Sequence, residues 1–127
     1  MRIITRRVHG VLDYLVGVLL ILAPTLFDFR IGGAAQWLPV TLGVATIIYS
    51  LLTRYELGAI RLLSFRTHLA LDAVNGVLLA LSPWIFGFSD QVFIPHLLLG
   101  LIELGAVMMT RADVSDGPRA RQARAAR

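Results

Sequence analysis

The sequence predicts an all-α integral membrane protein: a four-helix bundle built from two tandem helical hairpins. Three observations predict this class. Apolar residues make up 57% of the 127 residues, above the roughly 45–50% of soluble domains. They gather in four long segments. The first two segments recur in the last two, so we expect a pseudo-twofold axis along the membrane normal.

The four apolar segments are residues 8–27, 37–53, 67–88 and 92–110. Each has roughly the length needed to cross ~30 Å of hydrocarbon at about 1.5 Å per residue. Inside a bilayer the backbone must satisfy its own hydrogen bonds, so each segment is predicted to be a helix. The segments are apolar all round rather than on one stripe, which favours a membrane bundle over a soluble one. Residues 1–111 are therefore predicted to form one transmembrane domain.

An internal repeat relates the two halves of the chain. Residues 7–29 and 66–88 are identical at twelve of 23 positions, among them His9 with His68 and Asp13 with Asp72. The following segments match at an offset of 57, where Thr53-Arg54 corresponds to Thr110-Arg111. The repeats therefore cover about residues 7–54 and 66–111, and each is predicted to be one hairpin.

The charge pattern predicts an orientation. All twelve basic residues are arginines, and the net charge is +4. Only Arg30 falls in a loop on the side opposite the termini, so the positive-inside rule places both termini in the cytoplasm of a bacterial inner-membrane protein. Residues 112–127 are predicted to be a basic, disordered cytoplasmic tail. The arginines lack interleaved aromatic residues, so we expect lipid and not nucleic acid as the partner.

The second repeat carries a short motif, Ser82-Pro83-Trp84, followed by Ile85-Phe86-Gly87-Phe88. Together with the repeated hairpin, this motif resembles the SPW-repeat family of small prokaryotic membrane proteins. The first repeat departs from the motif and keeps only Pro24. The resemblance implies a duplicated membrane-spanning hairpin and no established activity.

Two His–Asp pairs are candidates for a polar site. His9 and Asp13, like His68 and Asp72, are four residues apart, which places each pair on one helix face. One interpretation is a proton relay or a pair of ligand sites. The alternative that we favour is a clasp, in which each aspartate accepts from its histidine or from an arginine that ends the neighbouring helix. The pairs would then be Arg54 with Asp13 and Arg111 with Asp72.

Glu103 falls near the middle of the fourth segment, where a charged side chain is costly. It is either a proton or cation site or a neutral acid hydrogen-bonded to a backbone carbonyl or to Asn75. The first repeat has Thr46 and Val16 at these two positions, so we expect Asn75 and Glu103 to meet. His96 is expected to be an interfacial residue rather than a metal ligand.

The function that the sequence favours is that of a structural, accessory or assembly protein acting by lateral helix contacts. Such a protein would work as a homo-oligomer or within a larger membrane complex. The alternative is a small proton- or cation-conducting transporter or channel subunit that uses Glu103 and the His–Asp pairs. No catalytic residues, metal or cofactor are expected, because the chain has no cysteine and no serine–histidine pair in a plausible place. Two symmetric histidines are compatible with a bis-histidine haem, which the adjacent aspartates disfavour.

Overall fold

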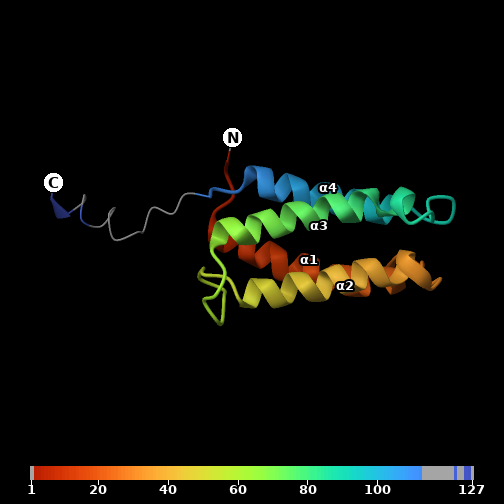
Figure 1. The fold of residues 1–127 in the computed structure, drawn as a ribbon, viewed down its shortest axis with the longest axis horizontal. Coiled ribbons are helices and arrows are strands. Elements are labelled where there is room, and N and C mark those ends of the chain that lie inside the picture. Colours follow the sequence, from red (N-terminus) through yellow and green to blue (C-terminus); the bar gives the residue numbers. More distant parts are fainter. Residues whose placement is uncertain (1, 113–121, 123–124, 127) are drawn as a thin grey trace.

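The computed structural model describes residues 2–112, 122 and 125–126, and its elements are four helices (Figure 1). The helices are α1 (Arg6–Leu26), α2 (Gly33–Leu51), α3 (Phe65–Ile85) and α4 (Ile94–Met109). The predicted all-α fold is confirmed. The tail expected at residues 112–127 lies almost wholly outside the described residues.

Each repeat folds as a hairpin, with α1 packed on α2 and α3 packed on α4. Glycines set the distance between the helices of each hairpin. A Cβ atom on Gly43 would lie 2.6 Å from the carbonyl oxygen of Gly17, and one on Gly100 would lie 2.6 Å from that of Gly76. These contacts leave no room for a side chain, so both hairpins depend on glycine for their close helix approach.

The helix ends also follow the repeat, with small shifts from the expected bounds. Thr5 and Ser64 accept hydrogen bonds from the backbone N–H of Val8 and Thr67 and so begin α1 and α3. α2 begins at Gly33, earlier than expected, because Gly32 and Gly33 have φ angles of +77° and +60° that reverse the chain just before it.

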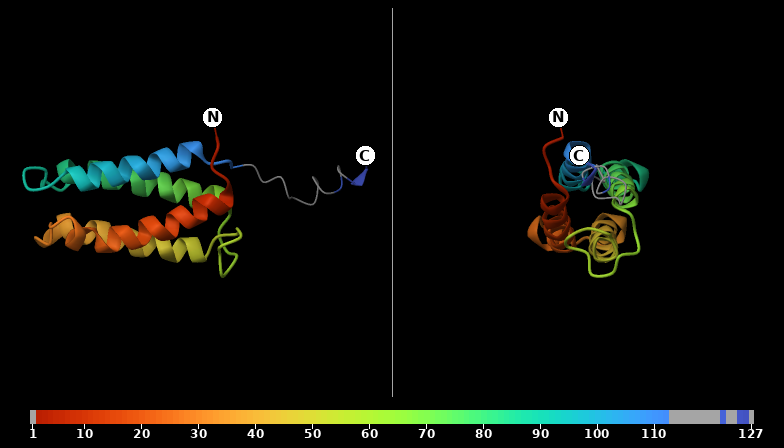
Figure 2. Two further views of the ribbon diagram at one scale, coloured as in Figure 1. Left: turned by 180° about the vertical axis from the view of Figure 1, so that it is seen from behind. Right: turned by 90° about the vertical axis from the view of Figure 1, so that its left-hand side faces the viewer.

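The two hairpins are joined by α2 against α3 and by backbone hydrogen bonds at the end of the bundle where α1 and α3 begin. The segment before α1 and the loop between α2 and α3 lie at this end (Figure 2). The N–H of Ile4 donates to the carbonyl of Met109 at 2.9 Å, and that of Leu63 donates to the carbonyl of Leu52 at 2.8 Å. Ile4 corresponds to Leu63 and Met109 to Leu52 in the repeat. Each hairpin therefore begins by pairing with the end of the other one.

The interior between the hairpins is apolar over most of its length. Its centre holds Leu20, Leu42, Leu79 and Leu99, two symmetric pairs that are all buried. Three of the described helices, α1, α2 and α3, are long and apolar enough to cross a membrane, and α4 is a shorter apolar helix of 16 residues. At about 1.5 Å per residue α4 is roughly 24 Å long.

Candidate functional site

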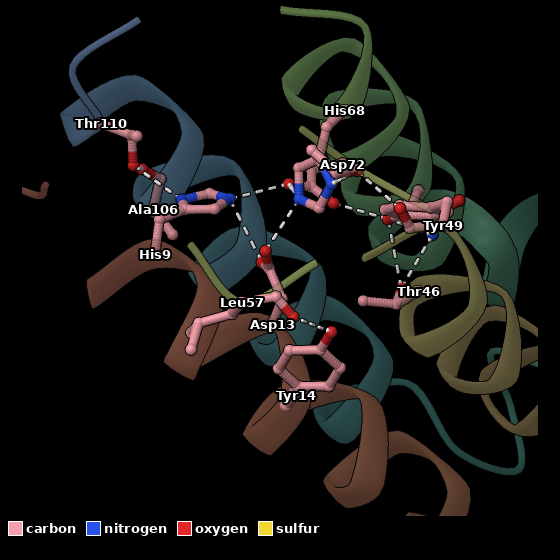
Figure 3. A network of polar contacts seen from close by, with 12 residues as sticks. His9, Asp13, Tyr14, Thr46, Tyr49, Leu57, His68, Asp72, Ala106 and Thr110 are labelled. Carbon is pink, nitrogen blue, oxygen red and sulfur yellow. Dashed lines mark hydrogen bonds and ion pairs between the residues drawn. The ribbon is translucent and has the colours of Figure 1, made fainter. Parts of the chain in front are cut away.

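Four polar side chains meet between the hairpins, about one turn inside the end where α1 and α3 begin (Figure 3). They are His9 and Asp13 from α1 and His68 and Asp72 from α3, which we call the His–Asp quartet. All four are buried, with at most 7% of any residue exposed. The structure therefore joins the two sequence pairs into a single site.

The quartet forms a closed ring of side-chain contacts, which passes through both carboxylate oxygens of Asp13. His9 Nε2 lies 2.8 Å from Asp72 Oδ2 and 3.2 Å from Asp13 Oδ1. His68 Nε2 lies 2.8 Å from Asp13 Oδ2 and 3.1 Å from Asp72 Oδ2. Each histidine is thus closer to the aspartate of the other repeat than to the aspartate on its own helix. The ring ties α1 to α3.

Two threonines fix the orientation of the imidazoles. Thr110 Oγ1 donates to the carbonyl of Ala106 and lies 2.7 Å from His9 Nδ1. Thr53 Oγ1 donates to the carbonyl of Tyr49 and lies 2.8 Å from His68 Nδ1. A hydroxyl has one proton, so each threonine must accept from an Nδ1–H. Both Nε2 atoms consequently face the carboxylates.

Aromatic rings surround the quartet on the side of the loop between α2 and α3. The Phe65 ring stacks on His68 at 5.8 Å between centroids, and the Tyr55 ring lies 5.5 Å from it. Burial raises the pKa of the Tyr55 phenol above its usual range, so the ring covers the quartet as a neutral group. This cover keeps the polar ring in a water-poor setting, where its hydrogen bonds are stronger.

The arginines that were expected to close each hairpin bind elsewhere. Arg54 Nε donates to the carbonyl of Arg61 at 3.2 Å, and Arg111 Nε donates to the carbonyl of Arg2 at 2.9 Å. Within the described part of the chain, neither arginine forms an ion pair with Asp13 or Asp72. The preceding threonines take the inward position, and the long arginine side chains reach the end of the bundle instead.

Asn75 does not meet Glu103 as expected. Its amide donates to Thr46 Oγ1 at 3.2 Å and to Tyr49 Oη at 3.1 Å. Tyr49 Oη in turn donates to Asp72 Oδ1 at 2.5 Å. Asn75 therefore extends the quartet along α2 and α3, whereas Glu103 lies on α4.

Glu103 is 9% exposed, and both of its carboxylate oxygens lack a hydrogen-bond partner in the described structure. It lines a cavity of about 50 Å³ together with residues of the quartet, His9, Asp13 and Asp72. One water needs roughly 10–15 Å³ of such space, so the cavity has room for water or a small ion beside the quartet.

The Ser82-Pro83-Trp84 motif lies at the opposite end of the bundle. Ser82 Oγ donates to the carbonyl of Leu79 at 2.7 Å, and Pro83 is buried. Trp84 is 52% exposed and packs beside Phe93 on its outer side. The motif thus shapes the end of α3 and lies away from the quartet.

His96 lies at the same opposite end, in the first turn of α4, and its side chain is buried. Its Nε2 donates to the carbonyl of Ala35 at 2.8 Å, which links α4 to α2. The rings of Phe29 and Phe88, themselves a repeat pair, each lie 4.9 Å from the imidazole. His96 thus joins the two hairpins at the end far from the quartet.

Three site residues were missed by the sequence analysis: Tyr49, Thr53 and Thr110. The two threonines did carry a signal, because they coincide in the repeat alignment. Tyr49 carried none, since its counterpart in the second repeat is Ala106. Its role depends on α2 lying against α3.

The fold and the site define a class: a membrane protein of two helical hairpins joined by a buried polar ring. The family model of the SPW repeat domain matches residues 7–110. The chain therefore belongs to the SPW repeat family, as its motif and duplication indicated. Comparisons with curated proteins and with solved structures gave no match.

Proposed function

We propose that this chain is a non-enzymatic accessory or assembly protein of the bacterial inner membrane that acts by lateral helix contacts. Both termini would lie in the cytoplasm. The arginine distribution supports this orientation, because Arg30 alone falls in a loop at the end that carries Trp37 and Trp84. Both tryptophans are more than half exposed, which suits a membrane interface.

The proposed lateral contact is supported by the position of Gly105. The glycines at 17, 43, 76 and 100 are used inside the hairpins, whereas a Cβ on Gly105 would meet nothing within 4 Å. Exposed Leu98, Leu101 and Met108 lie on the same face of α4 at helical spacing. This face has a notch of the kind that lets a second membrane helix approach closely. We propose a helix of a partner subunit as its occupant.

A non-enzymatic role is supported by the chemistry of the quartet. Thr53 and Thr110 are the hydroxyls beside the two histidines, but each accepts from Nδ1–H and gives its own proton to a carbonyl. A histidine in this arrangement holds a proton toward the hydroxyl and does not remove one from it. These threonines are therefore not activated as nucleophiles.

The test compares Gly105→Leu with a matched control. Ile48 is the repeat counterpart of Gly105 and is 52% exposed, so Ile48→Leu changes an outer face without filling a notch. The tagged proteins are purified from native membranes in mild detergent. We expect the wild type and Ile48→Leu to recover one partner at a fixed ratio, and Gly105→Leu to lose it while remaining folded. A monomeric wild type without a stoichiometric partner would overturn the proposal, and a pure homo-oligomer would replace the partner by a second copy.

A second candidate function is proton or cation conduction, and the unpartnered Glu103 beside a cavity favours it. In liposomes, a pH- or cation-sensitive dye would then report flux with the wild type and a loss of flux with Glu103→Gln. Equal flux by the two proteins, or none by either, would remove this candidate.

A further inference from the structure

The quartet has two sides that the repeat relates, one around Asp72 and one around Asp13. The residues beside these two aspartates differ. On the Asp72 side, Tyr49 and Thr46 from α2 and Asn75 from α3 form a continuous network that ends on Asp72. The repeat places Ala106, Glu103 and Val16 at the corresponding positions around Asp13.

The Asp13 side consequently lacks the polar groups that fill the Asp72 side. Ala106 cannot reach Asp13 as Tyr49 reaches Asp72, and Val16 cannot donate as Asn75 does. Ala106, Val16 and Glu103 all line the 50 Å³ cavity, together with Asp13. The cavity thus occupies the place of a missing phenol, and a buried carboxylate without a partner faces it. A polar occupant of the cavity would give this buried acid the hydrogen-bond partner that the described protein groups do not supply.

The quartet next to this cavity offers four metal-ligand atoms. The two Nε2 atoms and one oxygen of each aspartate all lie within 4.8 Å of one another. Both Nε2 atoms contact Asp72 Oδ2, at 2.8 and 3.1 Å, and they contact different oxygens of Asp13, at 2.8 and 3.2 Å. Zinc with bonds near 2.0–2.1 Å to four ligands has ligand–ligand edges of about 3.3 Å. To seat an ion, the contacts at Asp72 Oδ2 would lengthen by a few tenths of an ångström, and one oxygen of Asp13 would turn toward both nitrogens.

The hydrogen bonds around the ring are those of a metal site. Metal-binding imidazoles commonly donate their other N–H to an oxygen that fixes the ring. Thr110 and Thr53 supply this accepting oxygen for His9 and His68. Two neutral imidazoles and two carboxylates carry a charge of −2, which one divalent cation would neutralise in a setting where net charge is costly.

We propose that His9, Asp13, His68 and Asp72 bind one divalent first-row transition-metal ion, and that the Glu103 cavity holds a water next to it. Two imidazole nitrogens suit such an ion, whereas Mg²⁺ and Ca²⁺ prefer sites made of oxygen ligands. The ion replaces the protons that otherwise lie between Nε2 and the carboxylates. This inference goes beyond the proposed lateral contact, on the outer face of α4, and does not depend on it.

The first experiment titrates untagged, metal-free protein in detergent with Co²⁺, followed by its visible absorption. We expect bands that saturate at one Co²⁺ per chain and disappear when Zn²⁺ is added, but persist in millimolar Mg²⁺ or Ca²⁺. Absence of the bands at micromolar Co²⁺ would overturn the proposal, and so would bands from more than one weak site.

Variants then locate the ion. Asp72→Asn should weaken Zn²⁺ binding by more than about 100-fold, and Glu103→Gln by a smaller factor of roughly 10. Asp90→Asn, in an exposed loop, should bind as the wild type does. Unchanged affinity in a folded Asp72→Asn protein would contradict the assignment.

One further variant guards against loss of folding. This variant is Val16→Asn/Glu103→Thr/Ala106→Tyr. It gives Asp13 the residue types that surround Asp72 and leaves the quartet intact. We expect it to fold, to keep one Co²⁺ per chain and to show stronger absorption as the water is lost and the ion becomes four-coordinate. A spectrum identical to that of the wild type would show that the cavity holds no water beside the ion.

Discussion

His9 pairs with Asp72 across the two repeats, at 2.8 Å, in preference to Asp13 on its own helix at 3.2 Å. The mirrored contact between His68 and Asp13 has the same length. Because the nearest carboxylate to each histidine belongs to the other hairpin, the polar ring joins the two hairpins of the bundle.

Removing one carboxylate from this ring should destabilise the protein strongly. Asp72→Asn is expected to lower the free energy of unfolding by about 3–5 kcal/mol, because it leaves buried imidazoles without their charge partner. Reversible unfolding in mixed detergent micelles measures the change. Asp90→Asn, in an exposed loop, should stay within about 0.5 kcal/mol of the wild type. Equal values for the two variants would be inconsistent with a tightly bonded ring.

The threonines behind the histidines should matter for the same reason. Thr110→Val keeps the shape of the side chain and leaves the Nδ1–H of His9 unpaired, at a cost of about 1–3 kcal/mol. Thr53→Val should behave alike at His68. Thr41→Val, an exposed position on α2, is the control and should change stability little. Thermal unfolding followed by circular dichroism compares the three, and a Thr110→Val protein as stable as the control would remove the threonine from the site.

The helix glycines divide into two kinds. Gly43→Ala and Gly100→Ala should each lower stability by about 1–3 kcal/mol, since the added Cβ meets a backbone carbonyl across the hairpin. Gly105→Ala has open space and should be neutral or stabilising by up to about 1 kcal/mol, because alanine favours the helix. The same unfolding assay ranks them, and a reversed order would contradict the packing described here.

Glu103 should behave in the opposite way to the quartet. In metal-free protein, Glu103→Met is expected to raise the free energy of unfolding by about 1–3 kcal/mol, because it removes a buried carboxyl without a hydrogen-bond partner. Asp72→Leu, also apolar, should lower it. Destabilisation by Glu103→Met would mean that the acid has a partner in the folded protein.

The helices and their pairing could be predicted because hydropathy and the internal repeat can be read directly from the sequence. The quartet could be predicted only in part. The spacing of four placed His9 and Asp13 on one face, but the distance between α1 and α3 is set by packing that no single helix encodes. For this reason each aspartate was expected to pair within its own hairpin, with its histidine or with Arg54 or Arg111. Tyr49 and the cavity could not be predicted, since they arise where the two repeats differ.

The exchange of partners between the hairpins has an evolutionary consequence. A chain with one hairpin cannot complete the ring, because its histidine finds its nearest aspartate and its threonine elsewhere. Two such chains side by side would complete both halves, with the backbone bond between Ile4 and Met109 running between molecules. A single-hairpin ancestor would therefore have been an obligate dimer, and gene duplication would have made it one chain. In the fused chain the surroundings of the two aspartates can differ, with Tyr49 and Asn75 beside Asp72 and with Glu103 and a cavity beside Asp13.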